Sequence, residues 1–146
     1  MDFKHKSRFP WLSQLLYSIK HRGFANTCSM GMKEWKKERE LGIKTFGTYE
    51  PSDFSIEPHA LHAGHLYQPS SSVIFERVMK ALNINFKDLV FLDIGSGKGR
   101  AMILAAEHGF KKVIGVEYAS ELNEIAKSNI ELIKDRFPKT EFLLQE

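Results

Sequence analysis

The stretch Phe91-Leu92-Asp93-Ile94-Gly95-Ser96-Gly97-Lys98-Gly99-Arg100 decides how this chain folds. Its first half continues an apolar run that begins at Leu89, which is typical of a short strand in a parallel sheet. Three glycines at alternate positions follow, and they allow the backbone to turn sharply and to approach a ligand closely. A helix is predicted from Arg100 to His108, and the free amides of its first turn favour an electronegative group. The stretch therefore predicts a strand, a ligand-binding loop and a helix.

Regular elements continue on both sides of this stretch. Upstream, three serines at 70–72 offer caps for a helix that runs to Leu82. Downstream, residues 112–117 predict a second strand, Ser120 caps a longer helix that ends at Pro138, and residues 140–144 begin a third strand. The alternation of helices and strands predicts an α/β fold with three parallel strands.

The remaining half of the chain divides into two segments. Residues 1–41 form an N-terminal helical basic segment, in which four apolar residues fall on one helical face: Leu12, Leu15, Leu16 and Ile19. We expect that face to pack on the domain, with attachment to a membrane surface as the alternative. Residues 42–69 are irregular, rich in glycine and proline, and are predicted to form a loop or lid. Residues 70–146 then form the sheet-containing part.

Charge is concentrated near the start of the chain. Residues 1–40 hold nine Lys and Arg against four Asp and Glu, which is an excess of five. The signs alternate through residues 33–40, and this pattern is typical of a solvated helical face. Basic residues are not interleaved with aromatic ones, as they are where proteins stack on bases, so binding to nucleic acid is not expected.

Composition limits the class of protein. With 146 residues, 42% hydrophobic and 27% charged, the chain is expected to form a globular unit. No apolar run approaches the roughly 18 residues that span a bilayer, so no transmembrane segment is expected. The single cysteine, Cys28, excludes an intrachain disulfide and fits a reducing, cytoplasmic location.

The glycine loop matches two common nucleotide-binding motifs, the P-loop and the dinucleotide fingerprint, only in part. A P-loop needs Gly-x4-Gly-Lys followed by Ser or Thr, whereas Leu92 and Gly99 occupy the first and last of these positions. The dinucleotide fingerprint needs a glycine where Arg100 stands. An acidic residue, Glu117, ends the second strand 18 positions after Gly99, where a Rossmann-like unit binds ribose hydroxyls.

These residues resemble a known family. Phe91 to Arg100 is similar to motif I of the Rossmann-like (class I) S-adenosylmethionine-dependent methyltransferases, and Val113 to Glu117 is similar to their second strand. Tyr67-Gln68-Pro69 resembles the element before motif I in the subgroup of Dot1-like lysine methyltransferases. The resemblance implies S-adenosylmethionine as cofactor, in a partial Rossmann-like methyltransferase sheet that is preceded by an N-terminal helical segment.

The resemblance also implies the residues of the cofactor site. Asp93 would lie beside the methionyl amino group, Glu117 would hold the ribose hydroxyls and Tyr118 would lie against the adenine. The glycine loop would present its backbone to the cofactor, and Tyr67 would contact the cofactor from the loop side. The full set implied is Tyr67, Asp93, Gly95, Ser96, Gly97, Glu117 and Tyr118. No catalytic residue is assigned.

The expected activity is methyl transfer to an acceptor that the sequence does not identify, a protein side chain or a small molecule. One alternative is a truncated, inactive cofactor-binding or interaction module, because the chain ends soon after its third strand. A second alternative is an NAD-binding Rossmann protein.

Two further groups of residues have open roles. Three histidines, His59, His62 and His65, lie in the irregular segment, where we expect loop residues rather than metal ligands. Lys98 and Arg100 stand where they could meet an anion or stay solvated at the start of a helix.

Overall fold

The computed structural model describes residues 10–47, 49, 54 and 67–146. Its elements are α1 (Pro10–Arg22), α2 (Phe24–Leu41), α4 (Ser72–Leu82), β1 (Val90–Ile94), α5 (Arg100–Glu107), β2 (Lys112–Val116), α6 (Ser120–Ile133), η2 (Lys134–Arg136) and β3 (Glu141–Gln145). The predicted alternation of helices and strands is confirmed, with boundaries that move by a few residues. Ser120 is the first residue of α6 rather than its cap, and Ala119 takes the cap position without a side-chain hydrogen bond.

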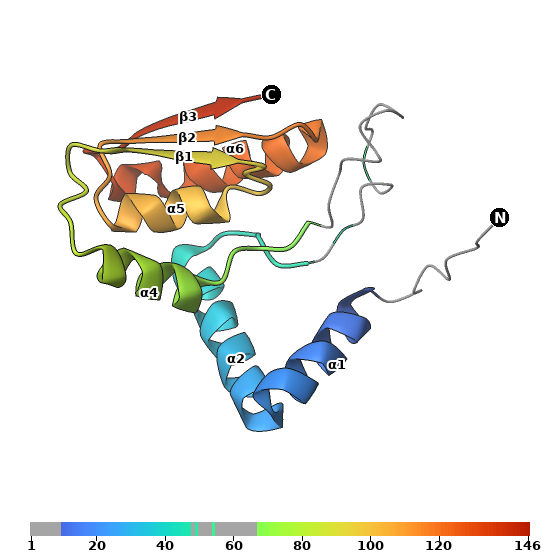
Figure 1. Cartoon of the computed structure of the whole chain (residues 1–146). Helices are drawn as coiled ribbons and strands as arrows, with labels where there is room; N and C mark the ends of the chain where they lie inside the picture. The colour runs from blue at the N-terminus through green and yellow to red at the C-terminus, as the bar shows by residue number, and fades with distance from the viewer. Residues whose placement is uncertain (1–9, 48, 50–53, 55–66) are drawn as a thin grey trace.

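The three strands form one parallel sheet in the order β1-β2-β3. In the middle of the sheet, Phe91 stands opposite Val113, which stands opposite Phe142. Figure 1 shows that both connecting helices, α5 and α6, lie on the same face of the sheet. This is the result of two successive crossovers of the same hand, each moving one strand further along the sheet. The predicted α/β fold with three parallel strands is confirmed.

The core lies between the sheet and these helices. Residues 101–106 of α5 are all buried, because the helix is covered by the sheet above and by α4 and the N-terminal segments below. One apolar cluster joins α4 and α5 to β2, and a smaller one joins α6 to the end of α2. The largest fully buried apolar side chains are Met102, Ile103, Val113 and Ile133.

The other face of the sheet is apolar and open within the described part of the chain. Val90, Leu92 and Ile94 alternate outward along β1 and are 54, 56 and 80% exposed. The sequence predicts a buried strand here, yet only the face that carries Phe91 and Asp93 is partly covered. β1 is also the edge strand of the sheet, so its outer hydrogen-bonding edge has no partner strand among the described residues.

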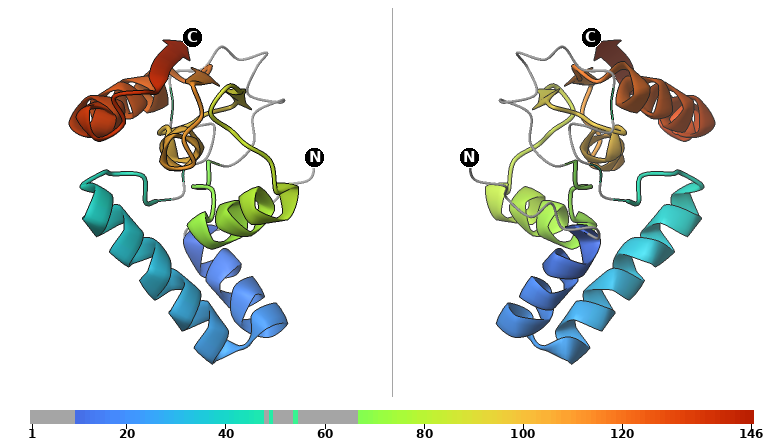
Figure 2. Two further views of the ribbon diagram at one scale, coloured as in Figure 1. Left: turned by 90° about the vertical axis from the view of Figure 1, so that its left-hand side faces the viewer. Right: turned by 90° about the vertical axis from the view of Figure 1, so that its right-hand side faces the viewer.

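The N-terminal helices form a hairpin beneath the sheet layer. α1 and α2 meet at Gly23, whose φ of 81° makes the sharp turn between them, and they diverge as a V in Figure 2. α2 packs against α4 and ends at the buried Leu41, after which Gly42 caps it in a left-handed conformation. No helix in the described residues is long and apolar enough to cross a membrane.

Candidate functional site

The glycine loop between β1 and α5 is held by the backbone of the next strand. Gly95 and Ser96 both donate their amides to the carbonyl of Val116, at 2.8 and 3.0 Å. Gly99 donates to the Ser96 carbonyl at 2.9 Å and closes the turn. Gly95, Gly97 and Gly99 have φ values of 78°, 54° and 78°, which L side chains rarely adopt. The alternating glycines are therefore required by the backbone path.

Glu117 fastens the same loop through its side chain. This carboxylate is buried, with 8% of the residue exposed, and it comes directly after β2. Oε2 accepts from the Gly97 amide at 2.7 Å, and Oε1 accepts from the Ala119 amide at 2.9 Å. A carboxylate has about four lone-pair positions, so each oxygen keeps one for a further donor.

Asp93 lies near the end of β1, and its negative charge interacts with that of Glu117. None of the described residues donates a hydrogen bond to its carboxylate. Burial raises the pKa of Asp93 above its ordinary value, and the negative charge of Glu117 raises it further. A cation that binds beside this carboxylate favours its ionised form and lowers its pKa.

The site is open at the strand ends. The Ser96 Oγ is buried and has no hydrogen-bond partner among the described residues, but it faces the core, where a Cβ at Gly115 would meet both it and the Met102 sulfur. A Cβ at Gly95 would meet no atom within 4 Å, so the loop is open there. Tyr118, directly after Glu117, is 54% exposed at the same edge of the sheet. Asp93, Ser96, Gly95, Glu117 and Tyr118 thus gather at the carboxyl ends of β1 and β2.

Tyr67 packs directly against the glycine loop. A Cβ at Gly97 would overlap the Tyr67 ring, which shows how closely the two are packed. The Tyr67 hydroxyl donates to the Thr45 carbonyl at 2.8 Å, and burial raises the pKa of this tyrosine. Its backbone pairs with that of Tyr49 in an isolated antiparallel bridge. All seven residues in the predicted set are therefore close to the loop or to the strand ends beside it.

Lys98 and Arg100 are not solvated, and this alternative of the sequence analysis is wrong. They are 4 and 3% exposed. The Lys98 ammonium donates to the Phe46 carbonyl at 3.1 Å and lies over the rings of Tyr49 and Tyr67, at 4.3 and 5.2 Å from their centroids. Both cations therefore bind protein groups of the N-terminal half.

The expectation of a solvated face at residues 33–40 is wrong for two of its acids. The Glu34 carboxylate pairs with Arg100, and its side chain is 15% exposed. Glu38 Oε1 accepts from the Thr45 amide and hydroxyl and from the Phe46 amide. Their spacing of four residues puts both on the face of α2 that ends at buried Leu41, and this is the signal that the charge alternation obscures.

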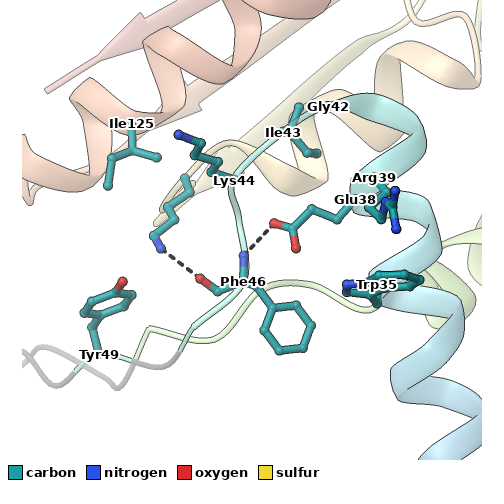
Figure 3. A pocket seen from close by; sticks show the side chains of 10 residues that line it. Trp35, Glu38, Arg39, Gly42, Ile43, Lys44, Phe46, Tyr49 and Ile125 are labelled. Atoms are coloured by element: carbon teal, nitrogen blue, oxygen red, sulfur yellow. Dashed lines mark hydrogen bonds between the residues drawn. The ribbon is translucent and has the colours of Figure 1, made fainter.

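A pocket of about 650 Å³ opens on the α2 side of the loop. Figure 3 shows the Glu38 carboxylate reaching the backbone of Phe46 across it, with Tyr49 on the opposite wall. Trp35, Arg39 and Lys44 complete much of its lining, whereas Asp93 and Glu117 do not contribute. This pocket is distinct from the edge where the candidate site residues gather.

The three histidines of the irregular segment lie outside the described residues. Among the residues that the structure does describe, no group of three or more His, Cys, Asp or Glu side chains is placed to hold a metal ion.

Parallel strands, a glycine loop after the first and a buried acid after the second define the cofactor-binding part of a Rossmann-like, class I S-adenosylmethionine-dependent methyltransferase. Within that class, the chain belongs to the family described as "Histone methylation protein DOT1", which matches residues 62–139, more than half of the chain. The resemblance drawn from the sequence is confirmed, and nothing in the matches favours an NAD-binding protein.

One curated relative is "Protein arginine N-methyltransferase 1" of Saccharomyces cerevisiae, which is 49% identical over 78 residues. The match covers 53% of this chain and 22% of the relative, so the chain spans about a fifth of that protein's length.

Solved structures of methyltransferases are also similar. A protein-L-isoaspartate O-methyltransferase is 18% identical, with a TM-score of 0.46 over 74% of this chain and 34% of its own. Geranyl diphosphate C-methyltransferase from Streptomyces coelicolor, solved with S-adenosyl-L-homocysteine, is 21% identical with a TM-score of 0.40, over 51% of this chain and 26% of its own. Both scores are low, so the family assignment depends on the sequence matches.

The packing of Tyr67 on Gly97 predicts a large cost for Gly97→Ala. The new Cβ adds overlap with the ring to the strain of a positive φ, and we expect the free energy of unfolding to fall by about 2–4 kcal/mol. Gly109→Ala is the matched control, because its φ is +80° but nothing lies within 4 Å, and it should cost about 1 kcal/mol. Urea unfolding measures both. In a Tyr67→Ala background, an undiminished cost of Gly97→Ala would contradict the contact.

Asp93 predicts a pH dependence of stability. Between the ordinary aspartate pKa and the raised pKa of Asp93, the folded protein holds a proton that the unfolded chain has released. Stability from this group therefore falls as pH rises through that interval. We expect Asp93→Asn to be more stable than the unaltered protein at pH 7, with the difference shrinking as the pH falls below the ordinary aspartate range. Unfolding curves across this range test it, and a difference that is independent of pH would contradict it.

Proposed function

We propose that this chain binds S-adenosylmethionine at the carboxyl ends of β1 and β2 and forms the methyl-donor site of a protein methyltransferase. The observation that carries the proposal is the pair of carboxylates at adjacent strand ends. Glu117 is fixed by two backbone amides, and Asp93 is half-buried and has no hydrogen-bond partner in the described part of the chain. Glu117 can accept hydrogen bonds from hydroxyl groups, and Asp93 can pair with a cation.

The residues at this edge match the chemistry of the cofactor. The two remaining lone pairs of Glu117 suit the two hydroxyls of a ribose. Asp93 suits the α-ammonium group, whose charge would lower the pKa that burial has raised. When bound, S-adenosylmethionine supplies a methyl group on a sulfonium that is already activated for transfer. The protein then has to hold this donor and to exclude water on its loop side, where Tyr67 covers Gly97.

A protein side-chain nitrogen is the acceptor that we propose. The family description refers to histone methylation, and the yeast relative is named as an arginine N-methyltransferase. Such a nitrogen needs only to be positioned in line with the methyl group in its neutral form, and no covalent enzyme intermediate is required. The single cysteine, which is exposed, is consistent with action in the reducing environment of the cytoplasm.

Cofactor binding is tested by calorimetric titration with S-adenosylhomocysteine. Asp93→Asn should weaken binding by about 10- to 100-fold, which corresponds to a hydrogen bond to a charged group. Glu117→Gln should weaken it at least as much, because an amide cannot accept from Gly97 and Ala119 with both of its terminal atoms. Asp135→Asn, on the exposed η2 turn, is the control and should leave affinity unchanged.

Two outcomes of the titration would contradict the proposed site. Unchanged affinity in both the Asp93 and the Glu117 variants would move the cofactor elsewhere on the protein. Binding of NAD without binding of either S-adenosylmethionine or S-adenosylhomocysteine would replace the methyltransferase proposal by the dinucleotide alternative.

The acceptor class is tested with methyl-labelled S-adenosylmethionine. We expect label to enter the protein fraction of a core-histone mixture, and free lysine and arginine to stay unlabelled, because the family match concerns histone methylation. The Asp93→Asn variant is the negative control. Label that enters only a small-molecule fraction of a cell extract would contradict a protein acceptor.

A further inference from the structure

A buried ion pair connects the N-terminal helices to the end of the glycine loop. Arg100 is the first residue of α5, directly after Gly99, and its Nη2 lies 2.7 Å from Oε2 of Glu34 on α2. The two side chains are 4 and 15% exposed. A buried pair of this kind is strongly coupled, since removing one partner leaves the other charge without compensation.

The Arg100 guanidinium contacts three segments at once. Besides Glu34, it donates from Nε to the Ser70 carbonyl at 3.0 Å and from Nη1 to the Thr45 hydroxyl at 2.7 Å. These partners come from α2, from the segment that follows it and from the approach to α4. The planar fork of arginine can satisfy all three, which the ammonium of a lysine cannot do in the same geometry.

Glu34 also accepts hydrogen bonds from residues at the start of α4. Its Oε1 accepts from the Ser71 hydroxyl at 2.7 Å, and its Oε2 accepts from the Ser72 amide at 3.1 Å. Burial acts to raise the pKa of Glu34, but hydrogen bonds from Ser71, Ser72 and Arg100 hold it below its ordinary value. The carboxylate is thus ionised and fully used, at a helix start where negative charge is favourable.

The contacts of Arg100 connect, through Thr45 and Tyr67, to the glycine loop that precedes Arg100 in the chain. Arg100 holds Thr45, whose carbonyl accepts from the Tyr67 hydroxyl, and the Tyr67 ring packs on Gly97. Gly97 lies three residues before Arg100 in the chain. The contacts therefore form a closed ring, which keeps Tyr67 pressed on the loop.

We propose that Glu34 and Arg100 are positioning residues for the cofactor loop: their ion pair holds the Thr45–Tyr67 wall against Gly97, so that the loop is already in its binding conformation before the cofactor arrives. This inference rests on the proposed function. Preorganisation of this kind raises affinity because the ordering cost is met during folding rather than during binding. Neither residue needs to touch the ligand.

The experiment compares this ion pair with another between the same two helices. Lys37 of α2 pairs with Glu107 at the far end of α5, at 2.6 Å, and Lys37→Met removes that pair without altering the loop's neighbours. Glu34→Gln and Arg100→Lys alter the pair beside the loop. Affinity for S-adenosylhomocysteine is measured by calorimetry at a temperature where circular dichroism shows each variant folded.

We expect Glu34→Gln and Arg100→Lys to weaken binding by about tenfold or more, and Lys37→Met to stay within about twofold of the unaltered protein. The double variant should lose less than the product of the two single losses, since the two residues act as one unit. The amide resonances of Gly95, Gly97 and Gly99 should shift in the ligand-free Glu34 and Arg100 variants but not in Lys37→Met, which a general loss of stability would not produce.

Folded Glu34 and Arg100 variants that bind within about twofold and leave the glycine resonances in place would overturn the inference. If the unaltered protein binds neither sulfur ligand, the proposed function fails, and the glycine resonances of the ligand-free variants still decide whether the pair positions the loop. Should Glu34→Gln not fold, Thr45→Val removes the hydroxyl that Arg100 contacts, together with its bond to Glu38, and leaves the ion pair in place; the same shifts and loss of affinity are expected of it.

Discussion

The Glu117 carboxylate is bound by two backbone amides that come from different segments, one in the glycine loop and one at the start of α6. A loop of alternating glycines has little conformational preference of its own, because glycine loses more freedom on folding than any other residue. The buried acid supplies the constraint that the loop lacks. It also determines the charge at this edge, since its negative charge is one of the two reasons for the raised pKa of Asp93. The loop's shape and the site's electrostatics thus both depend in part on this side chain.

Two buried cations, Lys98 and Arg100, lie where the loop meets the N-terminal half of the chain, and protein groups compensate the charge of each. The guanidinium of Arg100 has a carboxylate, a hydroxyl and a carbonyl as partners. The ammonium of Lys98 has a carbonyl and two aromatic faces. Desolvated charges are costly unless they are compensated in this way. Asp93, by contrast, accepts no hydrogen bond from any residue that the structure describes, and this difference is why we propose it as a ligand-binding group rather than a structural one.

The local structure could be predicted from the sequence, because it depends on neighbours along the chain. Apolar runs, glycine spacing and helix periodicity placed every strand, and Glu117 could be identified from its position after the second strand. The partner of Arg100 could not be predicted, since Glu34 is 66 positions away and is surrounded by residues whose alternating charges suggest a solvated face. The open face of β1 could not be predicted either: an apolar strand looks the same whether one or both of its faces are covered.

The bridge between Tyr49 and Tyr67 has a consequence for how this family can vary. Tyr49 and Tyr67 are joined by a pair of backbone hydrogen bonds, and both rings contact Lys98 beside the loop. Because these two positions are fixed to each other, a change in the number of residues between them need not alter the wall over the glycines, and a longer connection between two fixed points costs little extra free energy. The chain therefore has a position where evolution can insert or delete residues next to a binding site without rebuilding it.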